Sequence, residues 1–143
     1  MNIWILIGIA LGIGILVYVV ISVGQRKELQ AISSKREHIS ERQFLDHFIE
    51  LGYDEDITLE LRNQIKFYVP KRDFSMSPTD GLTEMYRADE EDLVDIAMKL
   101  FEKKHNVKPN KLDIALADKN DATIDTFEGI LKFVHQEPVA NNA

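Results

Sequence analysis

The sequence of 143 residues contains no cysteine. Disulfide bonds, thiolate nucleophiles and cysteine metal sites are therefore excluded, and the absence fits a reducing compartment. Positive charge is also scarce, because 17 lysines and arginines stand against 24 aspartates and glutamates and leave a net charge of −7. Nucleic acids and anionic lipids bind basic surfaces. We therefore expect a protein partner of basic or mixed charge, and no binding to nucleic acid.

Charge is missing altogether from the first part of the chain. Ile3–Val23 is 21 residues long and holds no charged side chain. A helix of that length spans the hydrocarbon core of a bilayer, which is about 30 Å thick. Trp4 and Tyr18 stand towards its two ends, where aromatic side chains favour the membrane interface. Residues 1–24 are thus predicted to be a single transmembrane anchor.

A cleaved signal peptide is the alternative for this segment. Signal peptides begin with basic residues, have a shorter apolar region and end in a small-residue cleavage site. Here only Asn2 precedes the apolar run after the initial methionine, no A-x-A pattern follows it, and Gln25, Arg26 and Lys27 come directly afterwards. We therefore expect the anchor to be retained.

The flanking charges predict how the anchor is oriented. Four basic residues follow it closely, and no lysine or arginine precedes it. By the positive-inside rule, the C-terminal part lies in the cytoplasm and the N-terminus outside. The expected location is the inner, cytoplasmic membrane of a bacterial cell. The four basic residues are Arg26, Lys27, Lys35 and Arg36.

Small residues recur within the anchor. Gly8 and Gly12 form a G-x-x-x-G pattern, and Ala10 with Gly14 repeats the spacing on what we take to be a neighbouring face. Such spacing lets two membrane helices approach closely, so Gly8 and Gly12 are a candidate surface for an oligomer or for docking onto another span. Glycine is also common in membrane helices for no such reason.

The sequence pattern predicts that the rest of the chain is mainly helical. Residues 25–39 are charged and predict a juxtamembrane helix or linker, residues 40–135 an acidic helical domain, and residues 136–143 a flexible tail. Ser40 and Gln43 form a capping box that opens the first helix of the domain. Apolar side chains then recur at helical spacing, and Gly52 is expected to close this helix in a left-handed conformation.

Three further helix starts are predicted from capping residues. Thr58, Asp89 and Thr123 each precede a run with helical apolar spacing. The strongest is Asp89, because acids fill the next turn and lysines follow near the end of the run. Lys71–Gly81 is predicted to be a loop, and the alternating Leu112–Leu116 a loop or short helical turn rather than a strand.

Three segments between about residue 59 and residue 135 carry a family resemblance. They are Arg87-Ala88-Asp89-Glu90-Glu91, Asn106–Pro109 and Thr123–Phe127. The first is similar to the Gly-Ala-Asp-Ser-Leu motif of acyl carrier proteins, and the other two are similar to that family's later turn and last helix. The resemblance implies a small four-helix bundle. It also implies that the carrier chemistry is lost, because Glu90 occupies the position of the serine that bears phosphopantetheine. No cofactor is therefore expected.

Residues with catalytic or metal-binding potential do not form a recognisable motif. The four histidines have no H-E-x-x-H spacing, and Asp118–Asp121 lacks the later ligands of a calcium loop. The acids that open the Asp89 helix are explained by capping. We expect no enzyme and no metal, and we consider instead a docking face for a basic partner or simply a solvated surface. The candidate docking residues are Glu90, Glu91, Asp95 and Glu102.

Overall fold

The computed structural model describes residues 3–69, 74–119 and 123–139 of the chain. It divides into two compact units, Met1–Arg36 and Glu37–Ala143. All regular elements in the described ranges are helices, and the only strand-like feature among them is an isolated bridge between Gly81 and Thr126. The prediction of an all-α protein is confirmed at this level.

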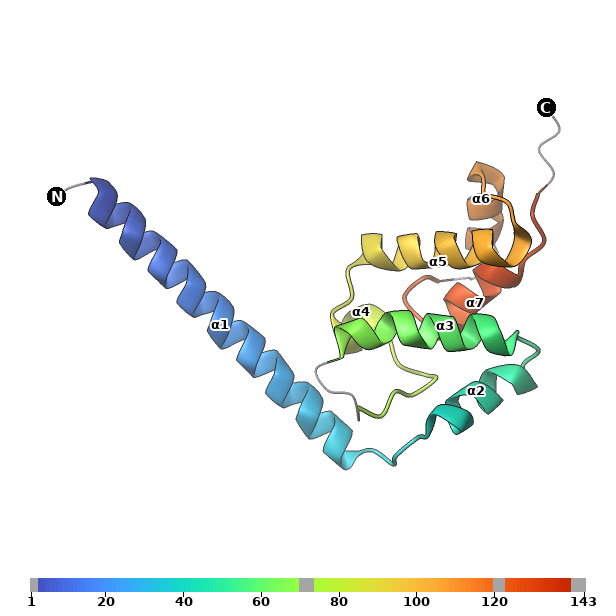
Figure 1. Ribbon diagram of the computed structural model, residues 1–143, viewed down its shortest axis with the longest axis horizontal. Coiled ribbons are helices and arrows are strands. Elements are labelled where there is room, and N and C mark those ends of the chain that lie inside the picture. Colours follow the sequence, from blue (N-terminus) through green and yellow to red (C-terminus); the bar gives the residue numbers. More distant parts are fainter. Residues whose placement is uncertain (1–2, 70–73, 120–122, 140–143) are drawn as a thin grey trace. The chain divides into compact units, whose positions relative to one another are not determined.

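The first unit is one uninterrupted helix, α1 (Ile3–Lys35), of 33 residues (Figure 1). The charged segment after residue 24 thus continues the helix of the apolar segment as far as Lys35. Ile7–Ile32 is long and apolar enough to cross a membrane by length and composition, a test that a signal sequence also passes. None of its most apolar window is buried within the structure.

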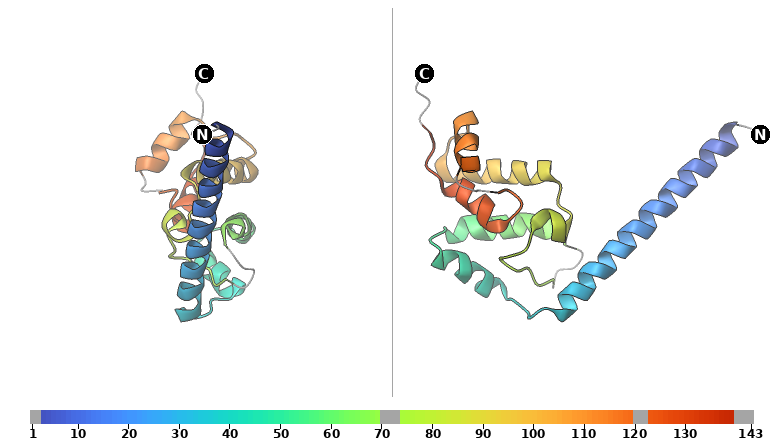
Figure 2. Two further views of the ribbon diagram at one scale, coloured as in Figure 1. Left: turned by 90° about the vertical axis from the view of Figure 1, so that its left-hand side faces the viewer. Right: turned by 180° about the vertical axis from the view of Figure 1, so that it is seen from behind.

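The second unit is built from six α-helices in its described residues, so the expected count of four is not confirmed. α5 packs against α7 and α3, while α2 packs against α3, and α6 against α7 (Figures 1 and 2). A 3-10 turn, η1 (Lys66–Tyr68), follows α3. The helices are α2 (Glu41–Glu50), α3 (Glu55–Ile65), α4 (Leu82–Tyr86), α5 (Glu90–His105), α6 (Lys111–Lys119) and α7 (Phe127–His135).

α2 begins and ends as its sequence predicts. The Ser40 hydroxyl accepts a hydrogen bond from the Gln43 amide, the Gln43 side chain accepts one from the Ser40 amide, and Gly52 has a φ of 91°. Phe44 and Phe48 are fully buried. The Phe44 ring meets Phe127 of α7 edge to face with ring centroids 5.0 Å apart, and the Phe48 ring is tilted against Phe127 at 6.4 Å. These aromatic contacts join the two ends of the unit's sequence in one core.

The predicted start of α3 at Thr58 is wrong. Its N-cap is Asp54, four residues earlier, and Thr58 is buried inside the helix with its hydroxyl donating to the Asp54 carbonyl at 2.8 Å. Arg62 of α3 is also buried, pairs with Glu41 of α2 and lies over the Phe44 ring. This hydrogen bond allows Thr58 to be accommodated inside the helix. The sequence pattern had instead predicted Thr58 as the N-cap.

The predicted loop Lys71–Gly81 is described from Phe74 onward, and residues 71–73 lie outside the described ranges. Phe74, Ser75 and Met76 are all buried, so this part of the loop packs into the core. The buried Asp80 carboxylate accepts hydrogen bonds from the Ser77 amide at 2.8 Å and from the Tyr86 hydroxyl. The short helix α4, which the sequence did not reveal, is thereby attached to the loop.

The last helix and the tail also differ from expectation. α7 is capped by Thr126, not by Thr123, because the Thr126 hydroxyl accepts from the Gly129 amide at 3.0 Å. The expected flexible tail is held as far as Val139, whose amide donates to the buried carboxylate of Asp113 in α6 at 2.6 Å. Residues 140–143 lie outside the described ranges.

Candidate functional site

The candidate site is the outward face of α5. Asp89 caps this helix, because its side chain accepts a hydrogen bond from the Glu91 amide at 3.0 Å. The opposite face is the core face, as predicted, and its five apolar side chains are all buried. They fix which side of the helix faces solvent. The five are Leu93, Ile96, Ala97, Leu100 and Phe101.

Helical geometry brings three of the four predicted docking residues together. Successive residues turn by about 100° around a helix axis, so Glu91, Asp95 and Glu102 fall within about 40° of one another. That stripe lies opposite the buried face, and all three side chains are exposed. Glu90 is also exposed, but it lies about 100° away from Glu91, outside the stripe and on the side of the buried face.

Within the described part of the chain these four carboxylates form no ion pair, although exposed Lys99 lies one helical turn after Asp95. The lysines at the end of α5 turn instead towards α3, where Lys103 pairs with Glu60 and Lys104 with Asp54. Unpaired carboxylates in a row produce a negative potential that is available to a partner. The first-turn acids still stabilise the helix through its dipole, a role that does not require a partner.

Asp92 differs from the four candidate docking residues because it contacts η1. The Tyr68 hydroxyl donates to the Asp92 carboxylate at 2.8 Å. Partial burial, this hydrogen bond and the negative charges of Asp92 and Asp89 together raise the pKa of Tyr68 to about 12. Tyr68 therefore stays protonated at neutral pH and ties η1 to the first turn of α5.

The outward face of α5 is not purely acidic. Val94 is 37% exposed and Met98 is half-buried, and both flank the carboxylate stripe by helical spacing. Exposed Lys99 stands at its other edge. A surface of this kind suits a protein partner, because apolar side chains contribute to the contact while the charges select the partner and speed association.

The histidines do not assemble a metal site or a catalytic pair in the described residues. His135 accepts a hydrogen bond from the Asp54 amide at 3.0 Å through Nε2, and its Nδ1 donates to the Leu131 carbonyl at 2.9 Å. Burial lowers the pKa of His135, so its neutral form is favoured. The ring holds the start of α3 against α7 and leaves neither nitrogen available for chemistry.

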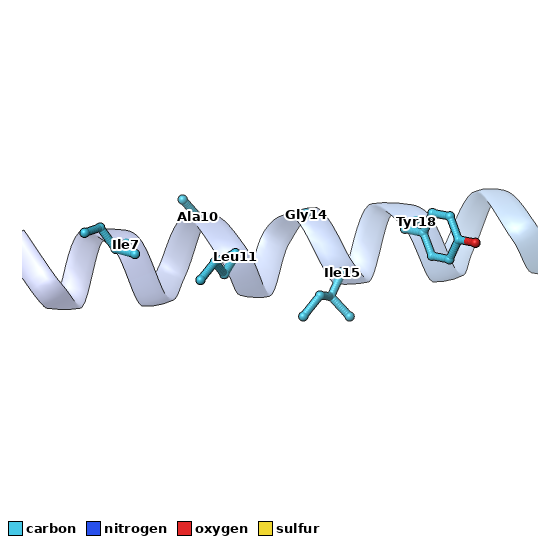
Figure 3. A pocket seen from close by; sticks show the side chains of 6 residues that line it. All are labelled: Ile7, Ala10, Leu11, Gly14, Ile15 and Tyr18. Carbon is cyan, nitrogen blue, oxygen red and sulfur yellow. The ribbon is translucent and has the colours of Figure 1, made fainter.

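The glycines of α1 face open space. A Cβ atom added to Gly8 or to Gly12 would meet no other atom within 4 Å. A shallow apolar groove runs along α1 on another side, lined by Ala10, Gly14 and larger neighbours (Figure 3). Two helical positions correspond to about 200°, so the Ala10 face lies nearly opposite Gly8 and not beside it as we expected.

Sequence reasoning overlooked one exposed aromatic side chain. Phe67, in η1, is 87% exposed and is the most exposed large apolar side chain described in either unit. A signal for it was present. By helical spacing Phe67 lies about 200° from Ile65, on the side opposite the apolar residues of this helix, so its exposure could have been predicted.

Comparison with known proteins gives no relative for this chain. No protein-family model matches the sequence, no curated protein matches it, and no solved structure matches the fold. A proposal for the function must therefore rest on the sequence and the structure of this chain.

Proposed function

We propose that this chain is a single-pass membrane protein that presents a non-catalytic, acidic docking module at the cytoplasmic face. The observation that carries the proposal is the outward face of α5, where Glu91, Asp95 and Glu102 form an exposed stripe whose carboxylates make no ion pair in the described residues. The partner is a protein with a basic or mixed-charge surface.

Exposure along α1 supports the membrane anchor. The apolar side chains that the structure describes between Ile7 and Val23 are all exposed. Soluble proteins rarely leave apolar patches larger than a few hundred Å² uncovered. A bilayer covers such a helix at no cost to its backbone, whose hydrogen bonds are all made internally. The basic residues that follow the span support a cytoplasmic second unit.

The carrier-like fold remains part of the proposal. α5 begins at Glu90, the residue that takes the place of the family's serine, directly after the cap at Asp89. A carboxylate cannot form the phosphodiester that attaches phosphopantetheine. The resemblance therefore supports a binding surface along this helix and gives no support to acyl transfer.

A second role, as a structural subunit of a larger membrane complex, is favoured by the small residues of α1. Gly8 and Gly12, or the groove beside Ala10 and Gly14, offer a surface onto which another span can pack. Replacing Gly8 and Gly12 with leucine separates the two roles. Loss of the complex assigns association to the span, and retention assigns it to the second unit.

Site-specific photo-crosslinking of the full chain in its own membranes tests the docking face. A crosslinking residue at Asp95 should capture a partner, and one at Asn63, exposed on α3, should not. The double variant Glu91→Lys, Asp95→Lys should abolish the crosslinked product at a position such as Glu102. The matched control is Glu50→Lys with Glu137→Lys, which changes the net charge equally at two other exposed acids. Equal capture in both double variants would refute the docking face.

A further inference from the structure

Two side chains of α6 hold the segment that follows α7. The Val139 amide donates to the Asp113 carboxylate at 2.6 Å, and the Val139 carbonyl accepts from the side-chain amide of Asn110 at 3.1 Å. Both backbone groups of one residue are thus bound by the side chains of another element. Figures 1 and 2 show residues 136–139 running beside α6. We call Asn110 and Asp113 the α6 clamp.

The α6 clamp is fixed in position by its own helix. The side-chain oxygen of Asn110 accepts from the Leu112 amide at 2.7 Å and from the Asp113 amide at 3.1 Å. The second carboxylate oxygen of Asp113 accepts from the Asn110 amide at 2.7 Å, which completes the reciprocal bonds of a capping box. Asp113 is only 1% exposed. The clamp is therefore preorganised to bind the backbone groups of a residue, whatever the side chain of that residue.

Residues 136–139 fill this site incompletely. Oε1 of Gln136 is buried without a donor among the described residues, although Nε2 of the same side chain donates to the Asp113 carbonyl at 2.6 Å. Leu112 and Ile114 lie about 100° to either side of Asp113 around α6 and remain 56% and 43% exposed. A buried acceptor without a donor destabilises the contact, and exposed apolar side chains contribute nothing to it. An occupant that meets both needs therefore binds better than residues 136–139.

We propose that the α6 clamp is a docking site for an extended segment of a partner protein, and that residues 136–139 are its exchangeable internal occupant. The partner segment offers one backbone N–H and C=O to the clamp, and large apolar side chains beside the clamped residue cover Leu112 and Ile114. The internal occupant lowers the apparent affinity for every partner, so weak ligands are excluded. This site lies on a different helix from the acidic face of α5, selects apolar and not basic character, and does not depend on the proposed function.

Peptide binding to the full chain in mild detergent tests the proposal. Val139→Pro removes the N–H that the Asp113 carboxylate accepts and should vacate the clamp, while Val139→Ala keeps that N–H and is the matched control. The probe is a synthetic peptide with the sequence of residues 136–143, and saturation-transfer NMR follows its binding. It should bind the Val139→Pro chain and bind the Val139→Ala chain roughly 10-fold more weakly. In the control, the chain's own segment competes at an effective concentration in the millimolar range.

Altered peptides test the individual contacts on the Val139→Pro chain. Methylation of the peptide nitrogen at Val139 removes only the donor and should weaken binding by roughly 10- to 150-fold, the effect of a hydrogen bond to a charged group. Leucine in place of Pro138 and Ala140 should tighten binding, because it covers the exposed apolar side chains of α6. Adding Asn110→Ser to the chain keeps an oxygen that caps α6 but removes the amide donor, and should weaken binding by roughly 2- to 12-fold.

Each part of the inference can fail separately. Equal binding of the native and the N-methylated peptide, or equal binding to the two Val139 variants, would overturn the α6 clamp as a peptide site. If the native peptide binds as expected but the leucine peptide binds no more tightly, residues 136–139 are the proper ligand and the partner segment is refuted. Circular dichroism checks that the variants are folded. Should Val139→Pro unfold the second unit, Asn110→Ser alone replaces it, and the same two peptide comparisons decide.

Discussion

Replacing Gly129 with alanine should destabilise the second unit far more than the same change at Gly81. A Cβ atom at this position would lie 1.6 Å from the carbonyl oxygen of Thr123 and 2.6 Å from its carbonyl carbon. The obstacle is backbone, so no change of side-chain rotamer relieves it. Either α7 must shift in the core or the turn before it must move.

The turn before α7 also makes hydrogen bonds to α4 through Asp125. The Asp125 carbonyl accepts from the Leu82 amide at 2.7 Å, and the Asp125 carboxylate accepts from the Thr83 amide at 2.7 Å. Overpacking costs about 1–3 kcal/mol, and each of these hydrogen bonds contributes about 1 kcal/mol. We therefore expect Gly129→Ala to lower the free energy of unfolding by roughly 2–4 kcal/mol. For a domain of this size, that corresponds to a fall in Tm of about 10–25 °C.

Thermal melting of the full chain in mild detergent, followed by circular dichroism, measures this fall. Gly81→Ala is the matched control, since a Cβ atom there would make only an ordinary contact, 3.7 Å from the Cβ of Glu84. Its Tm should stay within about 4 °C of the parent protein, the equivalent of about 0.5 kcal/mol. A Gly129→Ala protein that melts with the Gly81→Ala control would show that the close approach of Thr123 is not a constraint on the fold.

Three further outcomes are expected. Leu100→Ala should cost roughly 2–5 kcal/mol by chemical denaturation, because the side chain is buried in the core. Glu91→Lys with Asp95→Lys should cost less than about 1 kcal/mol by the same measurement, because both residues are exposed. Burial lowers the pKa of His135 in the fold, so the unfolded chain binds more protons below pH 6.5. Stability should be complete above that pH and fall as the pH drops through the lowered pKa, and denaturation of His135→Gln should lack this step.

The sequence predicted best those elements whose signals are local. The capping box at Ser40 and the cap at Asp89 both satisfy amides only a few residues away, so their helices begin where the pattern indicates. The outward face of α5 was predictable for the same reason, because helical spacing alone fixes which side chains lie opposite the core. No local sequence pattern indicates which partner binds the outward face of α5.

The errors arose where distant contacts decide between similar local signals. Thr58 and Thr123 both look like caps, yet the caps are Asp54 and Thr126. Asp54 is fixed by His135, which lies 81 residues away in the chain, and this contact carries no sequence pattern. The tail was misread in the same way, because its order depends on Asp113 of α6.

The connection between the two units was expected to include a linker up to residue 39, but its last part belongs to the fold. The Ile39 amide donates to the hydroxyl of buried Ser75 at 2.9 Å, and that hydroxyl donates to the Glu37 carbonyl at 3.5 Å. α1 ends at Lys35, so Arg36 alone separates it from the first residue held by Ser75. One intervening residue lets the chain span only about 7 Å between Lys35 and Glu37. The covalent connection therefore has no slack, and the first residues of the second unit follow the end of α1 directly.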